Sequence, residues 1–161
     1  NSNESILHML NEDAWAKTTV KSFVGMFGYQ SILMSNKIYY LYLSLWLIGG
    51  LGCLLKFKDL FSYKKDEKSK YILNYIFVIA IIIPILLSII YSYTSDFQPQ
   101  GRYIMGIIIP FMYFVVNGIQ TMLEKFIKSE KIRNIIIIMI MLFIIAISFK
   151  AIFSYVIPAY N

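Results

Sequence analysis

The sequence predicts an all-α integral membrane protein, with four transmembrane helices that follow an N-terminal extracytoplasmic amphipathic segment. Two observations lead to this fold class. The 161-residue chain is 58% hydrophobic and only 15% charged, whereas a soluble domain is about 45–50% apolar and about 25% charged. Its apolar residues also lie in blocks of about 20, the length that crosses a hydrocarbon core about 30 Å thick.

Residues 1–37 are too polar to cross a bilayer and are expected to lie at its outer interface. One group of apolar residues recurs at i, i+3, i+4 and i+7, which places it on one helical face: Val20, Phe23, Val24 and Phe27. Aromatic rings favour the headgroup region of a membrane. We therefore expect an interfacial helix that ends near Gly25–Gly28, followed by a loop through residues 31–37.

Residues 38–161 are predicted to form a four-helix transmembrane bundle. The spans cover roughly residues 38–56, 71–93, 103–123 and 134–157. Each should be a helix, because lipid offers no partner to an unpaired backbone N–H or C=O group.

Several residues within the spans predict how the helices pack. The stretch "GGLGC", residues 49–53, provides small side chains that allow close helix approach. Prolines at positions 84 and 110 predict kinks in the second and third spans. Three amide side chains are expected to form hydrogen bonds between helices: Asn74, Asn117 and Gln120.

The distribution of basic residues predicts the orientation. Residues 56–70 contain six lysines, and residues 124–133 contain three lysines and Arg133, so these two loops hold 10 of the 15 basic residues. By the positive-inside rule both loops are cytoplasmic. The N-terminal segment, the loop at residues 95–102 and the C-terminus then face outward. We therefore attribute the net charge of +6 to contacts with membrane lipids, and we expect no nucleic-acid partner.

The outer loop "SDFQPQGRYIMG", residues 95–106, contains the candidate ligand-binding residues. Pro99 favours an extended conformation before it, and Gly101 permits a tight or left-handed turn. Arg102 then falls in the first helical turn, where the helix dipole disfavours a cation. Three explanations remain open: snorkelling to lipid phosphate, pairing with Asp96, or bidentate binding of a functional anion. Gln98 and Gln100 would suit sugar hydroxyls.

Lys150, His8 and Cys53 are weaker candidates for a functional role. Lys150 is an intramembrane charge, which is either functional or snorkels to the outer interface. His8 is the only histidine and Cys53 the only cysteine, so neither a metal site nor a catalytic triad is expected. No cofactor motif is present, and no cofactor is expected. The chain begins at Asn1 without a signal pattern, which favours a C-terminal fragment of a longer polytopic protein.

Two stretches together, "SFVGMFGY" at residues 22–29 and "QPQGRYI" at residues 98–104, resemble a known family. They resemble the C-terminal part of the bacterial membrane family called domain of unknown function 2142, grouped loosely with GT-C type glycosyltransferases. The second motif matches at Gln100, Gly101, Arg102 and Tyr103. Val24 and Tyr29 replace tryptophans of the family pattern, and Pro110 comes later than its proline.

The resemblance implies a multi-pass protein of the bacterial cytoplasmic membrane that takes part in cell-envelope glycan assembly. It implies a polyprenyl-phosphate-linked sugar as partner, and it adds Tyr103 to Gln98, Gln100 and Arg102 as candidate contacts to phosphate or glycan. The catalytic acids of GT-C enzymes lie in an early outer loop that this chain does not contain, so no catalytic residue is identifiable. The alternative is a non-catalytic membrane subunit or transporter segment with a purely structural loop.

Overall fold

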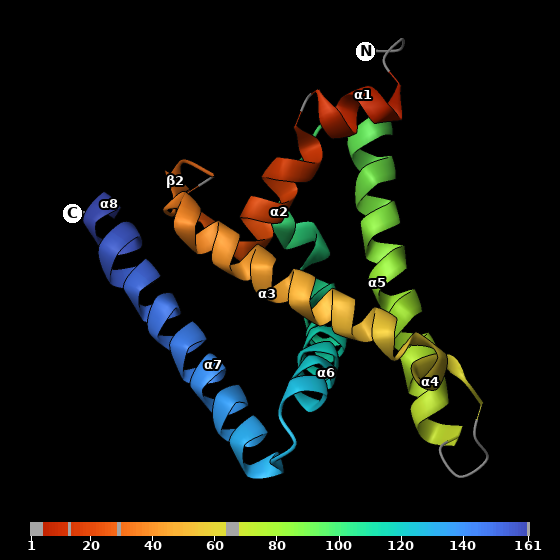
Figure 1. The fold of residues 1–161 in the computed structure, drawn as a ribbon. Coiled ribbons are helices and arrows are strands. Elements are labelled where there is room, and N and C mark those ends of the chain that lie inside the picture. The colour runs from red at the N-terminus through yellow and green to blue at the C-terminus, as the bar shows by residue number, and fades with distance from the viewer. Residues whose placement is uncertain (1–4, 13, 29, 64–67, 161) are drawn as a thin grey trace.

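The computed structural model describes residues 5–12, 14–28, 30–63 and 68–160, and its architecture is all-α, as predicted. Four helical stretches are long and apolar enough to cross a membrane: Asn36–Leu55, Lys68–Thr94, Gly101–Phe126 and Glu130–Tyr160 (Figure 1). In order, the elements are α1 (Ile6–Asn11), α2 (Trp15–Gly25), β1 (Met26–Phe27), β2 (Ile32–Leu33), α3 (Asn36–Leu55), α4 (Phe57–Phe61), α5 (Lys68–Thr94), the 3₁₀ turn η2 (Gly101–Ile107), α6 (Ile108–Phe126), α7 (Glu130–Ala151), the π-helical turn η3 (Ile152–Val156) and α8 (Ile157–Tyr160).

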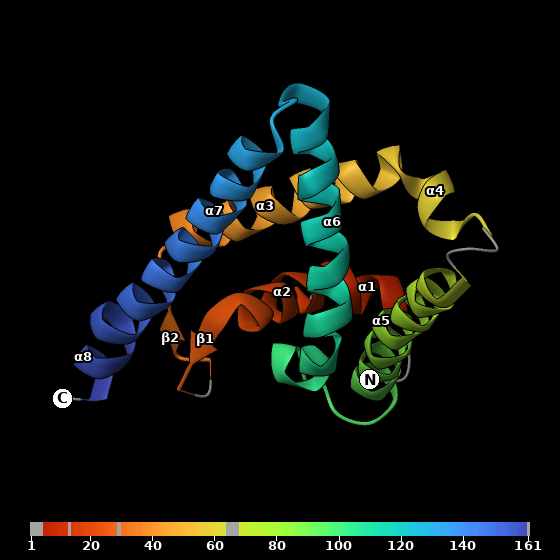
Figure 2. The same ribbon diagram turned by 90° about the horizontal axis from the view of Figure 1, so that it is seen from below.

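Helices α3 and α6 cross at glycines, which confirms the packing predicted from "GGLGC" (Figure 2). A Cβ atom on Gly52 would lie 1.9 Å from the backbone oxygen of Gly118, and one on Gly118 would lie 1.8 Å from the oxygen of Gly49. A Cβ atom on Gly50 would meet no atom within 4 Å. The two backbones are therefore in direct contact, and Gly118 supplies the α6 side of a crossing that the sequence indicated only on α3.

Of the three amide side chains expected to bridge helices, only Asn74 does so. Its amide nitrogen donates to the Leu60 carbonyl at 2.6 Å, and its oxygen accepts from the Tyr113 hydroxyl of α6 at 3.0 Å. Asn117 donates to the carbonyl of Tyr113, and Gln120 to Glu124, both within α6. A hydrogen bond to the preceding or following turn is geometrically available to any helical amide, so the interhelical prediction was wrong for these two.

The N-terminal segment differs from the prediction after Gly25. Helix α2 ends at Gly25, so Phe27 lies in strand β1 and not on the helical face with Val20. The expected loop contains β2, whose Ile32 pairs antiparallel with Phe27. Gly28 and Gln30 have φ of 54° and 70°, a left-handed backbone that turns the chain back on itself. Tyr29 lies outside the described residues.

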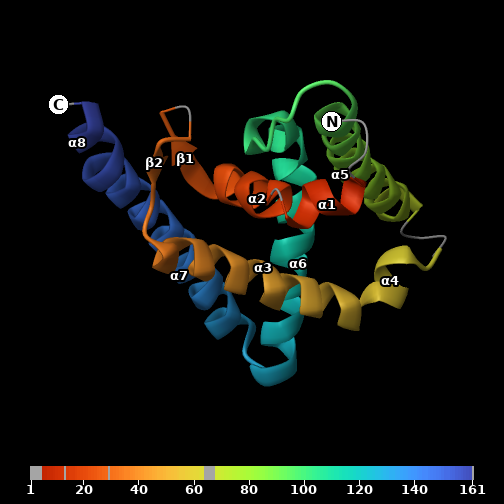
Figure 3. The same cartoon turned by 90° about the horizontal axis from the view of Figure 1, so that it is seen from above.

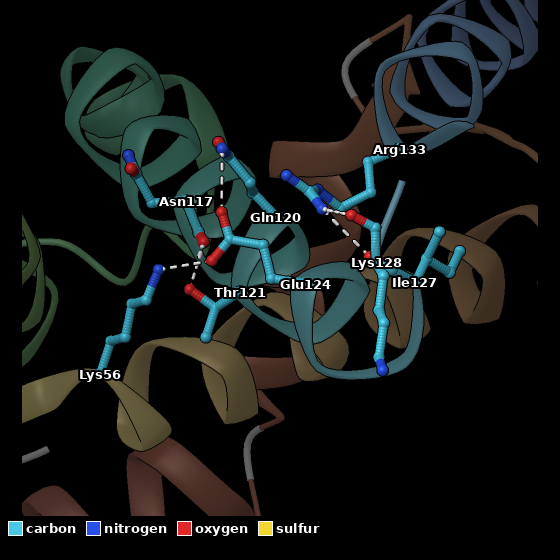
Figure 4. A network of polar contacts seen from close by, with 8 residues as sticks. All are labelled: Lys56, Asn117, Gln120, Thr121, Glu124, Ile127, Lys128 and Arg133. Atoms are coloured by element: carbon cyan, nitrogen blue, oxygen red, sulfur yellow. Dashed lines mark hydrogen bonds and ion pairs between the residues drawn. The ribbon is translucent and has the colours of Figure 1, made fainter. Parts of the chain in front are cut away.

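The two lysine-rich loops start at neighbouring ends of α3 and α6. Lys56, at the end of α3, forms an ion pair of 2.7 Å with Glu124 of α6 (Figure 4). Arg133 of α7 donates to the carbonyl oxygens of Ile127 and Lys128 in the turn between α6 and α7, each at 3.0 Å. The described parts of both loops are therefore joined at the ends of α3 and α6.

Helix α7 packs lightly against the rest of the protein (Figure 3). Ala151 is its only buried residue, and it joins Met34 and Tyr39 in a small core cluster. The turn η3 then contacts β2, which brings the C-terminal end beside the β-hairpin. Most of the apolar surface of α7 is left exposed by the protein, as expected of a helix that faces lipid.

Candidate functional site

The two sequence stretches that carry the family resemblance are in direct contact in the structure. A Cβ atom on Gly101 would lie 2.2 Å from the backbone nitrogen of Phe23 and 2.4 Å from its Cα atom. Gly101 is thus required for close approach of two backbones, and its φ is not left-handed, which corrects the reason given for this glycine. Gln30 adds a second link, because its side-chain nitrogen donates to the Pro99 carbonyl at 3.1 Å.

An aromatic cluster holds α2 against the membrane helices. The ring of Phe23 packs edge-to-face against Trp46 of α3 and Phe111 of α6, with centroids 5.8 and 6.2 Å apart, and Trp46 and Phe111 lie 5.1 Å apart. Such pairs contribute about 0.5–1.5 kcal/mol each beyond their buried area. The Phe23 ring is therefore shielded by protein, and α2 has a fixed position over the α3–α6 crossing.

A pocket of about 560 Å³ opens between these segments. Its wall is formed by residues 22–28, Gln30, Gln100, Arg102, Met105 and Tyr160. Of the described lining residues only Arg102 is charged, and the serine, glutamine and tyrosine side chains provide neutral hydrogen-bonding groups. Figure 2 shows α2 and β1 beside the green segment that contains η2. The pocket thus combines one cation with several neutral polar groups and apolar walls.

Arg102 lies in η2, at the start of the third span, and is exposed. Its guanidinium donates to the Tyr103 hydroxyl at 3.0 Å and lies 5.0 Å from the centroid of that ring. The suggested pairing with Asp96 is not formed, because the Asp96 carboxylate instead accepts from the Gln98 side chain at 2.6 Å. Since Tyr103 engages one of the five N–H donors of the guanidinium, others remain for an anion.

Gln98 is turned away from the pocket and belongs to the contact between α2 and α5. Its backbone carbonyl and N–H lie 3.4 Å from the Ser92 hydroxyl, which also accepts from the Trp15 indole at 2.9 Å. The side-chain oxygen of Gln98 is buried without a hydrogen-bond partner. Of the four candidate residues, Gln100 and Arg102 line the pocket, Tyr103 supports Arg102, and Gln98 holds the loop in place.

Four lining residues were not singled out by the sequence: Met26, Gln30, Met105 and Tyr160. Tyr160 belongs to α8. Apart from its position near the end of the chain, no feature of the sequence marked it as a candidate. Lys150 does not line this pocket. It is exposed in the last turn of α7, directly before the π-helical turn, and forms no ion pair with any described residue.

The four apolar helical stretches define a multi-pass helical membrane protein. No family model, curated protein or solved structure matches the chain.

Proposed function

We propose that this chain is the C-terminal transmembrane portion of a GT-C-like protein of cell-envelope glycan assembly. In this proposal the pocket between α2 and η2 binds the phosphate or glycan part of a polyprenyl-phosphate-linked sugar. The observation that carries the proposal is the direct contact of Gly101 with the Phe23 backbone. Gly101 and Phe23 are 78 residues apart in the sequence, and the two stretches on which the family resemblance rests both line this pocket.

The chemistry of the pocket supports an anionic, hydroxyl-bearing ligand. Arg102 offers a planar fork that matches phosphate oxygens in bidentate fashion. Gln30, Gln100 and Tyr160 supply neutral donors and acceptors of the kind that hydrogen-bond to sugar hydroxyls. No catalytic residue is assigned, because none of the described lining residues has a carboxylate side chain that would serve as a general base.

The orientation is part of the proposal. The pocket lies at the end of α3 and α6 where α3 begins and η2 leads into α6, while the lysine-rich loops lie at the opposite end of the same two helices. With the lysine-rich end in the cytoplasm, the pocket faces the outer side of a bacterial cytoplasmic membrane. Both ends of the chain are then extracytoplasmic, and the ligand is a lipid-linked group presented on that side.

A second candidate is a non-catalytic membrane subunit or transporter segment in which the outer loop is structural. The contacts of Gln98 favour it, because Ser92 engages the Gln98 backbone and the side-chain nitrogen of Gln98 donates to Asp96 within the protein. In that case Arg102 contributes only its stacking on Tyr103 and its attraction to lipid headgroups.

Ligand binding by Arg102 variants separates the two candidates. Native mass spectrometry of the full-length protein would measure binding of undecaprenyl phosphate, with uncharged undecaprenol as the reference ligand. We expect Arg102→Ala and Arg102→Lys to weaken phosphate binding about ten- to a hundredfold, because lysine keeps the charge but lacks the bidentate fork. Lys37→Ala is the matched control, since Lys37 is exposed at the same end of the molecule and does not line the pocket. Unchanged binding by Arg102→Lys would support the structural loop instead.

A further inference from the structure

A second pocket, of about 400 Å³, lies between α2 and the first half of α3. Figure 3 shows these two helices, which form its two walls. Lys17 and Lys21 line it from α2, and Tyr39 and Leu43 are among the α3 residues opposite them. Among the residues that the structure describes, none in this lining carries a carboxylate. The described lining of this pocket therefore carries two positive charges and no negative charge. The described lining of the pocket at Arg102 carries a single positive charge.

Lys17 and Lys21 share one face of α2, where Lys17 is exposed and Lys21 lies over a buried aromatic ring. They are four residues apart on α2, so they lie one above the other on one helical face, where like charges destabilise a helix. The Lys21 ammonium lies 5.3 Å from the centroid of the Tyr39 ring. That ring is only 4% exposed, and its hydroxyl donates to the Gly25 carbonyl at 2.8 Å and accepts from the Met34 N–H at 3.2 Å. Neither lysine forms an ion pair with any described residue.

We propose that this pocket binds the phosphate of an anionic phospholipid headgroup between Lys17 and Lys21. A phosphate oxygen between the two ammonium groups removes their repulsion and gives each a charge-assisted hydrogen bond. A lipid is favoured over free phosphate as the source, because apolar side chains continue the pocket beside the headgroup position. Val20 and Leu43, 36% and 39% exposed, offer that surface to the glycerol and the first acyl carbons.

The bound lipid would act as an anchor for α2. This helix supplies both the lysine pair and, directly after Lys21, the Ser22–Gly25 wall of the pocket at Arg102. A phosphate held at Lys17 and Lys21 fixes the depth of α2 in the interface. This inference does not depend on the ligand proposed for Arg102, because the two pockets share only Val24.

The test measures lipid binding by the full-length protein and by charge variants of the pair. Native mass spectrometry would compare phosphatidylglycerol with zwitterionic phosphatidylcholine for the wild type, Lys17→Gln/Lys21→Gln and Lys17→Arg/Lys21→Arg. We expect the glutamine pair to weaken phosphatidylglycerol binding about 30-fold, the arginine pair to retain it, and phosphatidylcholine binding to stay unchanged. Lys37→Gln serves as the control that should retain phosphatidylglycerol binding.

A photoactivatable phosphatidylglycerol locates the bound lipid in the wild-type protein, which keeps the test decisive if the glutamine pair folds poorly. Crosslinks should map to the peptide that contains Tyr39 and Leu43. Retained phosphatidylglycerol binding by a folded glutamine pair, or no crosslink in that peptide, would overturn the proposal. Inorganic phosphate that displaces the lipid at equal concentration would overturn the lipid as the source.

Discussion

Two neighbouring glycines of α3 provide a matched test of the helix crossing. A methyl group on Gly52 would lie 1.9 Å from the Gly118 oxygen, whereas a methyl group on Gly50 would meet no atom within 4 Å. The same substitution, two residues apart in one helix, should therefore have opposite effects. Gly50→Ala is expected to be neutral or stabilising by up to about 1 kcal/mol, because alanine is the better helix former.

The cost at Gly52 follows from the distance. Ordinary van der Waals contact begins at 3.4 Å, so α3 and α6 would have to separate locally by about 1.5 Å, which is 3.4 minus 1.9. Overpacking of this kind costs about 1–3 kcal/mol, and the upper end applies here because the obstacle is a backbone carbonyl and not a flexible side chain. After the gain in helix propensity, Gly52→Ala should be destabilised by about 2 kcal/mol.

The free energy of unfolding would be measured by titrating the protein in mixed micelles with sodium dodecyl sulfate and following the far-ultraviolet circular dichroism. Gly118→Ala should unfold as early as Gly52→Ala, since its methyl group would lie 1.8 Å from the Gly49 oxygen. If Gly52→Ala and Gly50→Ala unfold at the same detergent fraction, the two helices do not cross at these glycines and the reasoning is refuted.

Three further predictions concern orientation and buried hydrogen bonds. In a background where Cys53 is replaced by alanine, a cysteine at Ser69 should resist a membrane-impermeant thiol reagent in intact cells while one at Ser95 reacts; labelling at Ser69 alone would invert the orientation. Asn74→Ala should lower the free energy of unfolding by about 1–2 kcal/mol, because it leaves a buried carbonyl and a tyrosine hydroxyl unpaired. Trp15→Phe should lower it by about 0.5–1.5 kcal/mol through loss of the indole hydrogen bond to α5, and an unchanged detergent midpoint would contradict that contact.

Hydrophobic length and lysine position were enough to predict the helical class and the four apolar stretches. These signals are local, because each depends on composition within one segment. The "GGLGC" stretch also predicted close packing correctly, but it did not identify Gly118 as the partner, since a lone glycine in α6 has no local signature. Which helix a small residue meets is decided by tertiary structure alone.

The candidate site was predictable only in part for the same reason. The chemistry of Arg102 could be inferred from its position at a helix start, but its stacking on Tyr103 depends on side-chain geometry that sequence spacing does not specify. The helical periodicity of the sequence extends to Phe27, but helix α2 ends at Gly25. The left-handed backbone at Gly28 and Gln30 forms a hairpin there instead. Turn conformation prevailed over periodicity at that point.

The uneven packing of the spans has a consequence for how the protein fits bilayers of different thickness. The third span is held by backbone contacts at two places, Gly101 and Gly118, so it cannot tilt without moving α2 and α3 with it. The stretch Glu130–Tyr160 is 31 residues long, or about 46 Å as a helix, against a hydrocarbon core of about 30 Å. Its excess length and sparse contacts make it the element that accommodates hydrophobic mismatch by tilting. Thinning the bilayer should therefore change the inclination of α7 first and leave the α3–α6 crossing unaltered.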